Sequence, residues 1–293
     1  ERTMETIDYS KRITTRGKEM PLFSPVLSRI IDILNNEDFH LKDVVQVMET
    51  DASLTSRVLR VANSAAFPAI NPVDNIARAI PRLGMHLLLS IAVESSTSHI
   101  YDKPLSGYES AKGDLWSHSL RTAIAAREIA LRVKIDISPG LAYTAGLLHD
   151  MGKVIISEFL EGKTSQMVKW CDNSIVDDYI DAEREIIDTN HAKVGYSLAK
   201  CWNFPKSLQD AIAFHHHPES CCRENRVLTY LVHLGDIVAM LGGSGTGADT
   251  LVYKIQPGYK DYFHISKNDL ASILINVLTE FDRTRSLIFG VNV

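Results

Sequence analysis

The chain has 293 residues, of which 45% are hydrophobic and 23% are charged, a balance typical of a soluble globular protein. A formal net charge of −5 and a pI near 6.1 exclude bulk electrostatic attraction to nucleic acid or anionic lipid, so we expect neither a nucleic-acid partner nor a membrane. The four cysteines fit neither a disulfide framework nor a CxxC zinc site, and we therefore expect a reducing, cytoplasmic location.

Residues 1–20 are charged and show no periodic pattern, which predicts an N-terminal tail. Over residues 21–108 the apolar residues recur at helical spacing, and the turns between the helices are short. The pattern is interrupted near Pro81–Gly84, which predicts two helices there rather than one. Because no run of residues alternates between apolar and polar, as a half-buried β-strand does, we predict an all-helical N-terminal bundle.

A segment rich in turn-forming residues, 101–113, separates this bundle from a second helical series. We predict that residues 109–242 form a second helical domain packed on the first, so the expected fold class is all-α. Residues 243–293 follow as a connection and a final helix. The run GGSGTGAD at this junction lacks the lysine of a phosphate loop and is interpreted as a flexible connection. The final helix is amphipathic and is predicted to pack on the body.

The stretch AGLLHDMGKVII, which starts at Ala145, places a histidine next to an aspartate in an otherwise apolar pattern. Adjacent helical side chains point about 100° apart, but His149 and Asp150 can converge on one metal ion at a helix end or bend. Gly152 is a candidate cause of such a bend. Alone the pair is weak evidence, because a buried histidine satisfied by a neighbouring aspartate is the more common arrangement.

Four more histidines and one aspartate stand at positions that predict further ligands. They are His118, His191, His215, His216 and Asp236. Each has an ordinary alternative: the helix surface for His118, an exposed loop for the histidine run, and the solvent face for Asp236, with Gly235 marking a close helix contact. Together they favour a metal site, because helical bundles hold metal ions with imidazole and carboxylate ligands from several helices.

The motifs that carry these residues resemble, in order, those of the HD superfamily of metal-dependent phosphohydrolases. They are WSHSL (116–120), GLLHDMGK (146–153), NHAKVGYSLAKCWNFP (190–205), AIAFHHHP (211–218) and LVHLGD (231–236). METDASLTSRVLRVANSAAF (48–67) and NPVDNIARAIPRLGMHLLLSIAV (71–93) resemble the signature of the HDOD domain, the HD-related output domain of bacterial signalling proteins. The likeness runs from about residue 21 to residue 240, with residues 109–242 as the HD-type part.

The resemblance implies a ligand set. One metal ion would be shared by His118, His149, Asp150 and Asp236. Di-metal members of the superfamily add histidines at positions that match His191, His215 and His216, with Asp150 as the bridge. One or two divalent ions are expected, and the mixed nitrogen and oxygen ligands suit iron, manganese, nickel or zinc. Many HDOD proteins are thought to lack some of these ligands, whereas this chain keeps them all.

The same resemblance assigns catalytic roles to Asp150 and Lys153. Two metal ions would activate water for attack on phosphorus, and Lys153, where related phosphodiesterases neutralise phosphate, would stabilise the added charge. The ordinary alternative for Lys153 is a cation near a helix end. Asp114 matches a metal-binding glutamate of some relatives. The continuation HHHPESCCREN lacks the pattern of the HD-GYP phosphodiesterases, which argues against cyclic di-GMP as substrate.

Two functions from different classes follow. One is a phosphohydrolase or phosphodiesterase acting on a nucleotide or another phosphorylated signalling molecule. The other is a non-catalytic signalling module that binds a protein partner and has a structural or vestigial metal site. An open coordination position in an accessible cavity favours the enzyme, and a closed or plugged site favours the module. The sequence leaves this choice and the oligomeric state open.

Three smaller predictions concern the roles of individual side chains. Asn63 and Ser64 are expected to end a helix and bond backbone groups, with a partner-facing surface as the alternative. Trp116 and Trp202 are expected to anchor the core rather than stack on a ligand. The adjacent cysteines 221–222 are expected to be unreactive.

Overall fold

The computed structural model describes residues 12–13, 15–16, 25–34, 40–67, 72–101, 103–133, 135–250 and 252–289. Within these ranges every regular element is a helix, and the only extended pairing is an isolated bridge between Leu105 and Ser110. The predicted all-α fold class is confirmed. The placement of a domain boundary between residues 108 and 109 stays a prediction.

The described residues between 25 and 101 form five helices. They are α2 (Pro25–Leu34), α3 (Leu41–Glu49), α4 (Ala52–Ala62), α5 (Ile76–Leu83) and α6 (Met85–Tyr101). The predicted break is confirmed, because α5 ends at Leu83. The next residue, Gly84, has a φ of 78°, a backbone conformation that residues other than glycine rarely adopt. Helix α4 begins where the Asp51 carboxylate accepts hydrogen bonds from two backbone amides.

Asn63 ends α4 and ties the chain to the residues that lead into α5. Its side-chain amide donates to the carbonyl of Val73 at 2.8 Å, and its side-chain oxygen accepts from the amide of Val73 at 2.7 Å. The predicted structural role of Asn63 is confirmed, because this pair of bonds closes the loop between the two helices.

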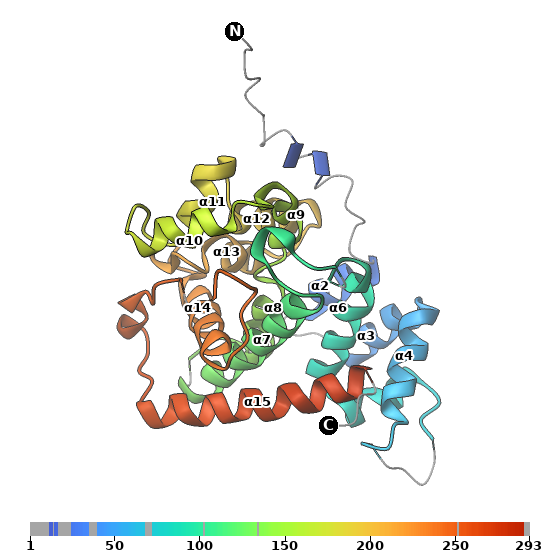
Figure 1. Cartoon of the computed structure of the whole chain (residues 1–293). Coiled ribbons are helices and arrows are strands. Elements are labelled where there is room, and N and C mark those ends of the chain that lie inside the picture. Colours follow the sequence, from blue (N-terminus) through green and yellow to red (C-terminus); the bar gives the residue numbers. More distant parts are fainter. Residues whose placement is uncertain are drawn as a thin grey trace.

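The part that follows residue 109 contains eight helices up to residue 241. They are α7 (Asp114–Val133), α8 (Pro139–Leu148), α9 (Lys153–Leu160), α10 (Thr164–Asp172), α11 (Tyr179–Ile187), α12 (His191–Cys201), α13 (Lys206–Phe214) and α14 (Arg226–Leu241). Helix α7 is central and packs against both α8 and α14 (Figure 1). Gly146 on α8 and Gly235 on α14 permit this closeness, because a Cβ at either position would lie less than 3.0 Å from α7.

The last helix, α15 (Lys267–Phe289), runs along α7 and reaches the N-terminal helices (Figure 1). Its buried face includes Phe281, and the ring of Trp116 lies 6.2 Å from that ring and 4.9 Å from the ring of Phe289. The predicted packing of an amphipathic C-terminal helix is confirmed. Trp116 and Trp202 are both buried, as predicted for core residues.

Two further predictions concern the chain's ends and its apolar helices. The predicted tail, residues 1–20, lies outside the described residues except for the helical residues 12–13 and 15–16, where Arg16 forms a 3.4 Å ion pair with Glu158. In the described ranges no single helix combines the length and hydropathy needed to cross a bilayer. Only α5 together with the first part of α6 meets that criterion, as a pair bent by 114°.

Candidate metal centre

The His149–Asp150 pair lies in the turn between α8 and α9. Gly152 in this turn has a φ of −67°, an ordinary helical value, so it does not act through unusual backbone freedom. The glycine is needed for space instead, because a Cβ there would lie 2.0 Å from the carbonyl oxygen of His191. The turn is therefore pressed against the first residue of α12, which brings Asp150 close to His191.

His118 on α7 and Asp236 on α14 approach the pair from two other helices. The Nε2 atom of His118 is 3.0 Å from Asp236 Oδ1 and 3.6 Å from Asp150 Oδ2. The Nε2 atom of His149 is 3.4 Å from the same oxygen of Asp150. His118 and Asp236 are 1% and 2% exposed, which excludes the surface alternatives for both. Gly235 does mark a close helix contact, as that alternative supposed.

Three histidines gather at the other carboxylate oxygen of Asp150. The Nε2 atoms of His191 and His215 lie 3.4 and 3.6 Å from Oδ1. The Nε2 atom of His216 is 2.9 Å from that of His191. Both His215 and His216 are buried, so the exposed-loop alternative is wrong for them, whereas His217 is partly exposed. Asp150 thus joins two groups of side chains, one at each of its oxygens.

The orientation of these imidazole rings is fixed from their outer sides. Three of them donate from Nδ1 to a backbone carbonyl oxygen: His118 to Ser244 at 2.7 Å, His149 to Gly146 at 2.8 Å and His215 to Ile212 at 2.9 Å. Because a carbonyl oxygen only accepts, each Nδ1 carries a proton, and Nε2 of the neutral ring keeps a lone pair directed inward. Histidines that bind metal ions are commonly held in this way.

Glu183 on α11 orients His191, and sequence reasoning missed it. Its Oε2 atom accepts from the Nδ1 of His191 at 2.8 Å and from the backbone amide of His191 at 2.9 Å. Tyr108 donates to its Oε1 at 2.6 Å. Asn190 caps α12 and so makes His191 the first helical residue. No periodic signal reveals Glu183, because it contacts His191 from a different helix across a turn.

His233 on α14 holds the turn that carries His215. Its Nδ1 donates to the carbonyl oxygen of His215 at 2.8 Å, and its Nε2 accepts from the backbone amide of Gln256 at 2.9 Å. Burial lowers the pKa of His233 to about 4, so the ring is neutral and suits this donor and acceptor pair. His233 therefore supports a predicted ligand without facing the cluster itself.

Residues 244–250 and 252–253, which we call the covering segment, lie against the ligand cluster. Lys153 Nζ is 2.8 Å from Asp150 Oδ2 and 2.6 Å from Asp249 Oδ2. It also donates to the hydroxyl of Thr246 at 2.8 Å. Thr246 and Asp249 are 2% and 1% exposed, so this run packs on the cluster as well as connecting two helices, and its predicted flexibility stays a prediction. Its polar side chains reach inward between glycines, a pattern that composition alone does not distinguish from a linker.

Tyr253 anchors the far end of the covering segment. Its ring stacks on that of His216, with centroids 4.1 Å apart and an angle of 23° between the planes. Its hydroxyl donates to Asp249 Oδ2 at 2.9 Å. At Gly247 the φ is 120°, and a Cβ would lie 2.0 Å from the carbonyl oxygen of Tyr108, so only glycine fits. The predicted ligands are therefore closed off on this side.

Carboxylates outnumber cationic side chains in the cluster. The cluster contains four buried acids, Asp150, Glu183, Asp236 and Asp249, and one buried ammonium, that of Lys153, which contacts Asp150 and Asp249. Against the effect of burial, His149 and Lys153 hold the pKa of Asp150 well below its usual range. Burial lowers the pKa of His149 to about 4. Against the effect of burial, Asp236 raises the pKa of His118 and Glu183 raises that of His191, so these two rings offset part of the negative charge. Buried charge without compensation costs several kcal/mol per ion, so the remaining excess of carboxylates favours the binding of cations.

The donor atoms fit divalent metal ions. Five buried atoms of the cluster have no hydrogen bond among the described residues, although Asp150 Oδ2 is in ion-pair contact with Lys153. They are His118 Nε2, His149 Nε2, His216 Nδ1 and both oxygens of Asp150. Two overlapping groups have ligand atoms within 4.8 Å of one another: Asp150 with His191, His215 and His216, and Asp150 with His118 and His149. Mixed imidazole and carboxylate ligation suits first-row transition metals. The arrangement brings two groups of candidate metal ligands together at Asp150.

The family model of the HDOD domain matches residues 20–218, most of the chain. The chain belongs to the HDOD domain family. An HDOD domain protein of unknown function from Geobacter sulfurreducens has a similar structure, with a TM-score of 0.70 and 25% identity, covering 98% of this chain and 100% of that one. A Shewanella amazonensis protein provisionally named a phosphohydrolase has a TM-score of 0.56 and 23% identity over 95% and 96% of the two chains, a likeness of fold alone.

An uncharacterized protein of Treponema pallidum is 26% identical over 222 residues, which is 73% of this HDOD chain. The chain spans only 40% of the length of that curated relative.

Two other groups of polar residues in this HDOD protein have ordinary roles. The carboxylate of Asp114 accepts from the amide of Ala111 at 2.7 Å and so serves the start of α7 rather than the cluster. Asp210 lies near Cys221 and Cys222, but it already accepts hydrogen bonds from neighbouring side chains, including Asn225 at 2.8 Å. Burial raises the pKa of Cys221 to about 11, in accord with an unreactive thiol.

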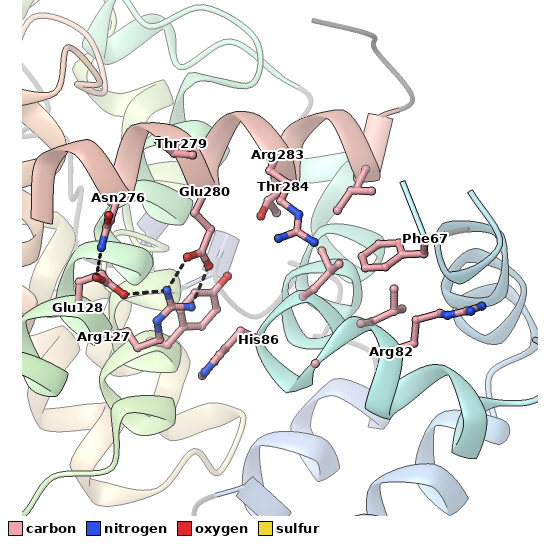
Figure 2. Close-up of a pocket in the computed structure, with 15 residues that line it drawn as sticks. Phe67, Arg82, His86, Arg127, Glu128, Asn276, Thr279, Glu280, Arg283 and Thr284 are labelled. Atoms are coloured by element: carbon pink, nitrogen blue, oxygen red, sulfur yellow. Dashed lines mark hydrogen bonds and ion pairs between the residues drawn. The ribbon is translucent and has the colours of Figure 1, made fainter. Parts of the chain in front are cut away.

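A cavity of about 460 Å³ lies between the N-terminal helices, α7, α8 and α15 (Figure 2). On one side Arg127 pairs with Glu280 at 2.8 Å and with Glu128 at 3.1 Å. On the other side the guanidinium of Arg283 lies 5.7 Å from the ring centroid of Phe67. No predicted metal ligand lines this cavity, so the cavity is separate from the ligand cluster around Asp150.

Proposed function

We propose that this HDOD protein is a bacterial signal-transduction protein whose HD centre holds one or two divalent metal ions and hydrolyses a phosphoester. The observation that carries the proposal is the cluster around Asp150, in which imidazole nitrogens and carboxylates from five parts of the chain face one another with an excess of buried negative charge. The likeness of the N-terminal helices to signalling output domains supports the regulatory role.

The residues have separate roles in this proposal. One ion would be held by His118, His149, Asp150 and Asp236, and a second by Asp150, His191, His215 and His216. When bound, such ions lower the pKa of a water molecule and polarise a phosphoryl oxygen. Water oxygen becomes bonded to phosphorus and gives up a proton to solvent, the bond to the leaving oxygen breaks with its electron pair on that oxygen, and the leaving oxygen takes up a proton from solvent. Lys153 supplies positive charge next to Asp150, where the phosphoryl group gains negative charge.

A second candidate, a non-catalytic signalling module that binds a protein partner, is favoured by the closure of the site. Each predicted ligand is at most 3% exposed, and the covering segment bonds both His118 and Lys153. In that case the metal ions would hold the helices together, and substrate would have no access.

Turnover by the manganese-loaded protein separates the two candidates. The substrates are p-nitrophenyl phosphate, bis-p-nitrophenyl phosphate and a panel of nucleotides and cyclic nucleotides. We expect manganese-dependent hydrolysis that is abolished in Asp150→Ala and retained in Asp177→Ala, a matched loss of a carboxylate that is exposed and pairs only with Lys254. Metal-loaded wild-type protein without turnover on the whole panel would contradict the hydrolase and favour the module.

A further inference from the structure

The covering segment brings a carboxylate to the place where the proposed function requires an anion. Lys153 bridges two acids: Asp150, the shared ligand, and Asp249, which belongs to no predicted ligand set. A lysine that stabilises a phosphoryl group has to meet that group's oxygens directly. Here Asp249 occupies this contact with its Oδ2 at 2.6 Å, the shorter of the two.

Three donors converge on Asp249 and together resemble an anion-binding site. Thr246 donates from its hydroxyl to Oδ1 at 2.8 Å, Tyr253 donates to Oδ2 at 2.9 Å, and Lys153 adds its ammonium. Ammonium and hydroxyl donors arranged in this way bind the oxygens of carboxylate and phosphate alike. The site lies directly beside Asp150 and is buried, with Asp249 1% exposed.

We propose that Asp249 fills the phosphoryl subsite of the HD centre, so that the covering segment is a built-in competitor for a phosphorylated ligand. This inference rests on the proposed function of the metal centre. It assigns Lys153 to the phosphoryl group of a phosphate ester, gives Thr246 and Tyr253 the role of holding Asp249 in place, and makes closure a reversible state of the site.

The composition of the covering segment allows it to move aside. Among its described side chains only Val252 and Tyr253 pack on the apolar core, and the others are small or polar, so few apolar contacts are lost when it opens. Gly243, directly before the segment, has a φ of 80°, and Gly247 within it has a φ of 120°. These glycines can adopt other backbone conformations at low cost. Lys254, after the segment, makes only an exposed ion pair with Asp177 at 3.5 Å.

A tethered carboxylate competes with free phosphate at a high effective concentration. Asp249→Asn keeps the size of the side chain and removes its charge, so it should tighten binding of inorganic phosphate by roughly tenfold relative to wild type. Tyr253→Phe keeps the stack on His216 and removes one hydrogen bond to Asp249, so it should tighten binding by a smaller factor, about threefold. Asp177→Asn, which alters only the exposed pair, should match wild type.

The experiment is calorimetric titration of inorganic phosphate into each manganese-loaded protein, with the metal content of every sample measured by elemental analysis. Hydrogen exchange of residues 244–253 in the wild type should rise when phosphate is added, because the ligand displaces the segment. Equal phosphate affinity in wild type, Asp249→Asn and Tyr253→Phe at full metal content would overturn this inference alone. A wild-type protein that takes up no metal would overturn the proposed function together with it.

Discussion

The helices before residue 102 and those after residue 113 are stabilised in different ways. In the first set the buried side chains are largely aliphatic, and polar residues such as Asp51 and Asn63 serve helix ends and loops. In the second set α7, α12 and α14 enclose histidines and acids that belong to no apolar core. Hydrophobic burial suffices for the first set, whereas the second holds charge that only cations can compensate.

Metal removal gives the largest expected effect and tests this difference directly. An ion present at about 1,000 times its dissociation constant stabilises the folded state by about 4 kcal/mol. Chelation should therefore speed hydrogen exchange in α7, α8 and α14 and leave α3, α4 and α5 nearly unchanged. Exchange measured by mass spectrometry with and without chelator checks this. Equal loss of protection in both sets would contradict the comparison.

Gly152→Ala should give the next largest effect. The added Cβ would lie 2.0 Å from the carbonyl oxygen of His191, so the HD turn must move away from α12. We expect a loss of about 3 kcal/mol in the free energy of unfolding, measured in urea. Gly140→Ala is the matched control, because its Cβ meets no atom closer than 3.5 Å. Similar urea midpoints for the two variants would contradict the packing role of Gly152.

Glu183→Gln should weaken metal binding without unfolding the protein. Glu183 accepts from the Nδ1 of His191, and loss of such a partner typically lowers metal affinity by about 10–100-fold. Competition with a chelating dye measures this affinity. Glu185→Gln, an exposed change on the same helix, is the control and should bind as the wild type does. An unchanged affinity in Glu183→Gln would remove His191 from the ligand set.

Asn63→Ala should have the smallest effect and one confined to the N-terminal helices. It removes both bonds to Val73, so we expect a loss of about 1–2 kcal/mol in the free energy of unfolding. Asn173→Ala, which removes a single exposed bond to the carbonyl of Lys169, should cost less. The metal content per chain should not change in either variant. A lower metal content in Asn63→Ala would contradict the comparison, because it would show that the N-terminal helices help to hold the metal ligands in place.

The sequence predicted the helices and the clustered side chains for different reasons. Periodicity and capping residues act locally, so the break at Gly84 and the amphipathic α15 could be read from spacing. The convergence of His118, His149 and Asp236 could not be derived from spacing, and it came from the order of motifs that resemble a family. The residues that hold the ligands, Glu183 and His233, were missed because each contacts its partner from a different helix or turn, 8 and 18 residues away, which no helical spacing covers.

The covering segment shows a second limit of sequence reasoning. Its alternating glycines and small polar residues have the composition of a linker. Only the structure shows that Thr246 and Asp249 reach Lys153, and that Ser244 accepts from His118. Whether a glycine-rich run is a linker or a buried cover depends on what lies beneath it, which local composition does not encode.

Elemental analysis of the purified wild type and Asp150→Ala tests the central claim most directly, because Asp150 is the residue that joins both groups of ligands. The account predicts one or two divalent ions per chain in the wild type and almost none in the variant, with the variant still helical by circular dichroism. The same metal content in both proteins would contradict it.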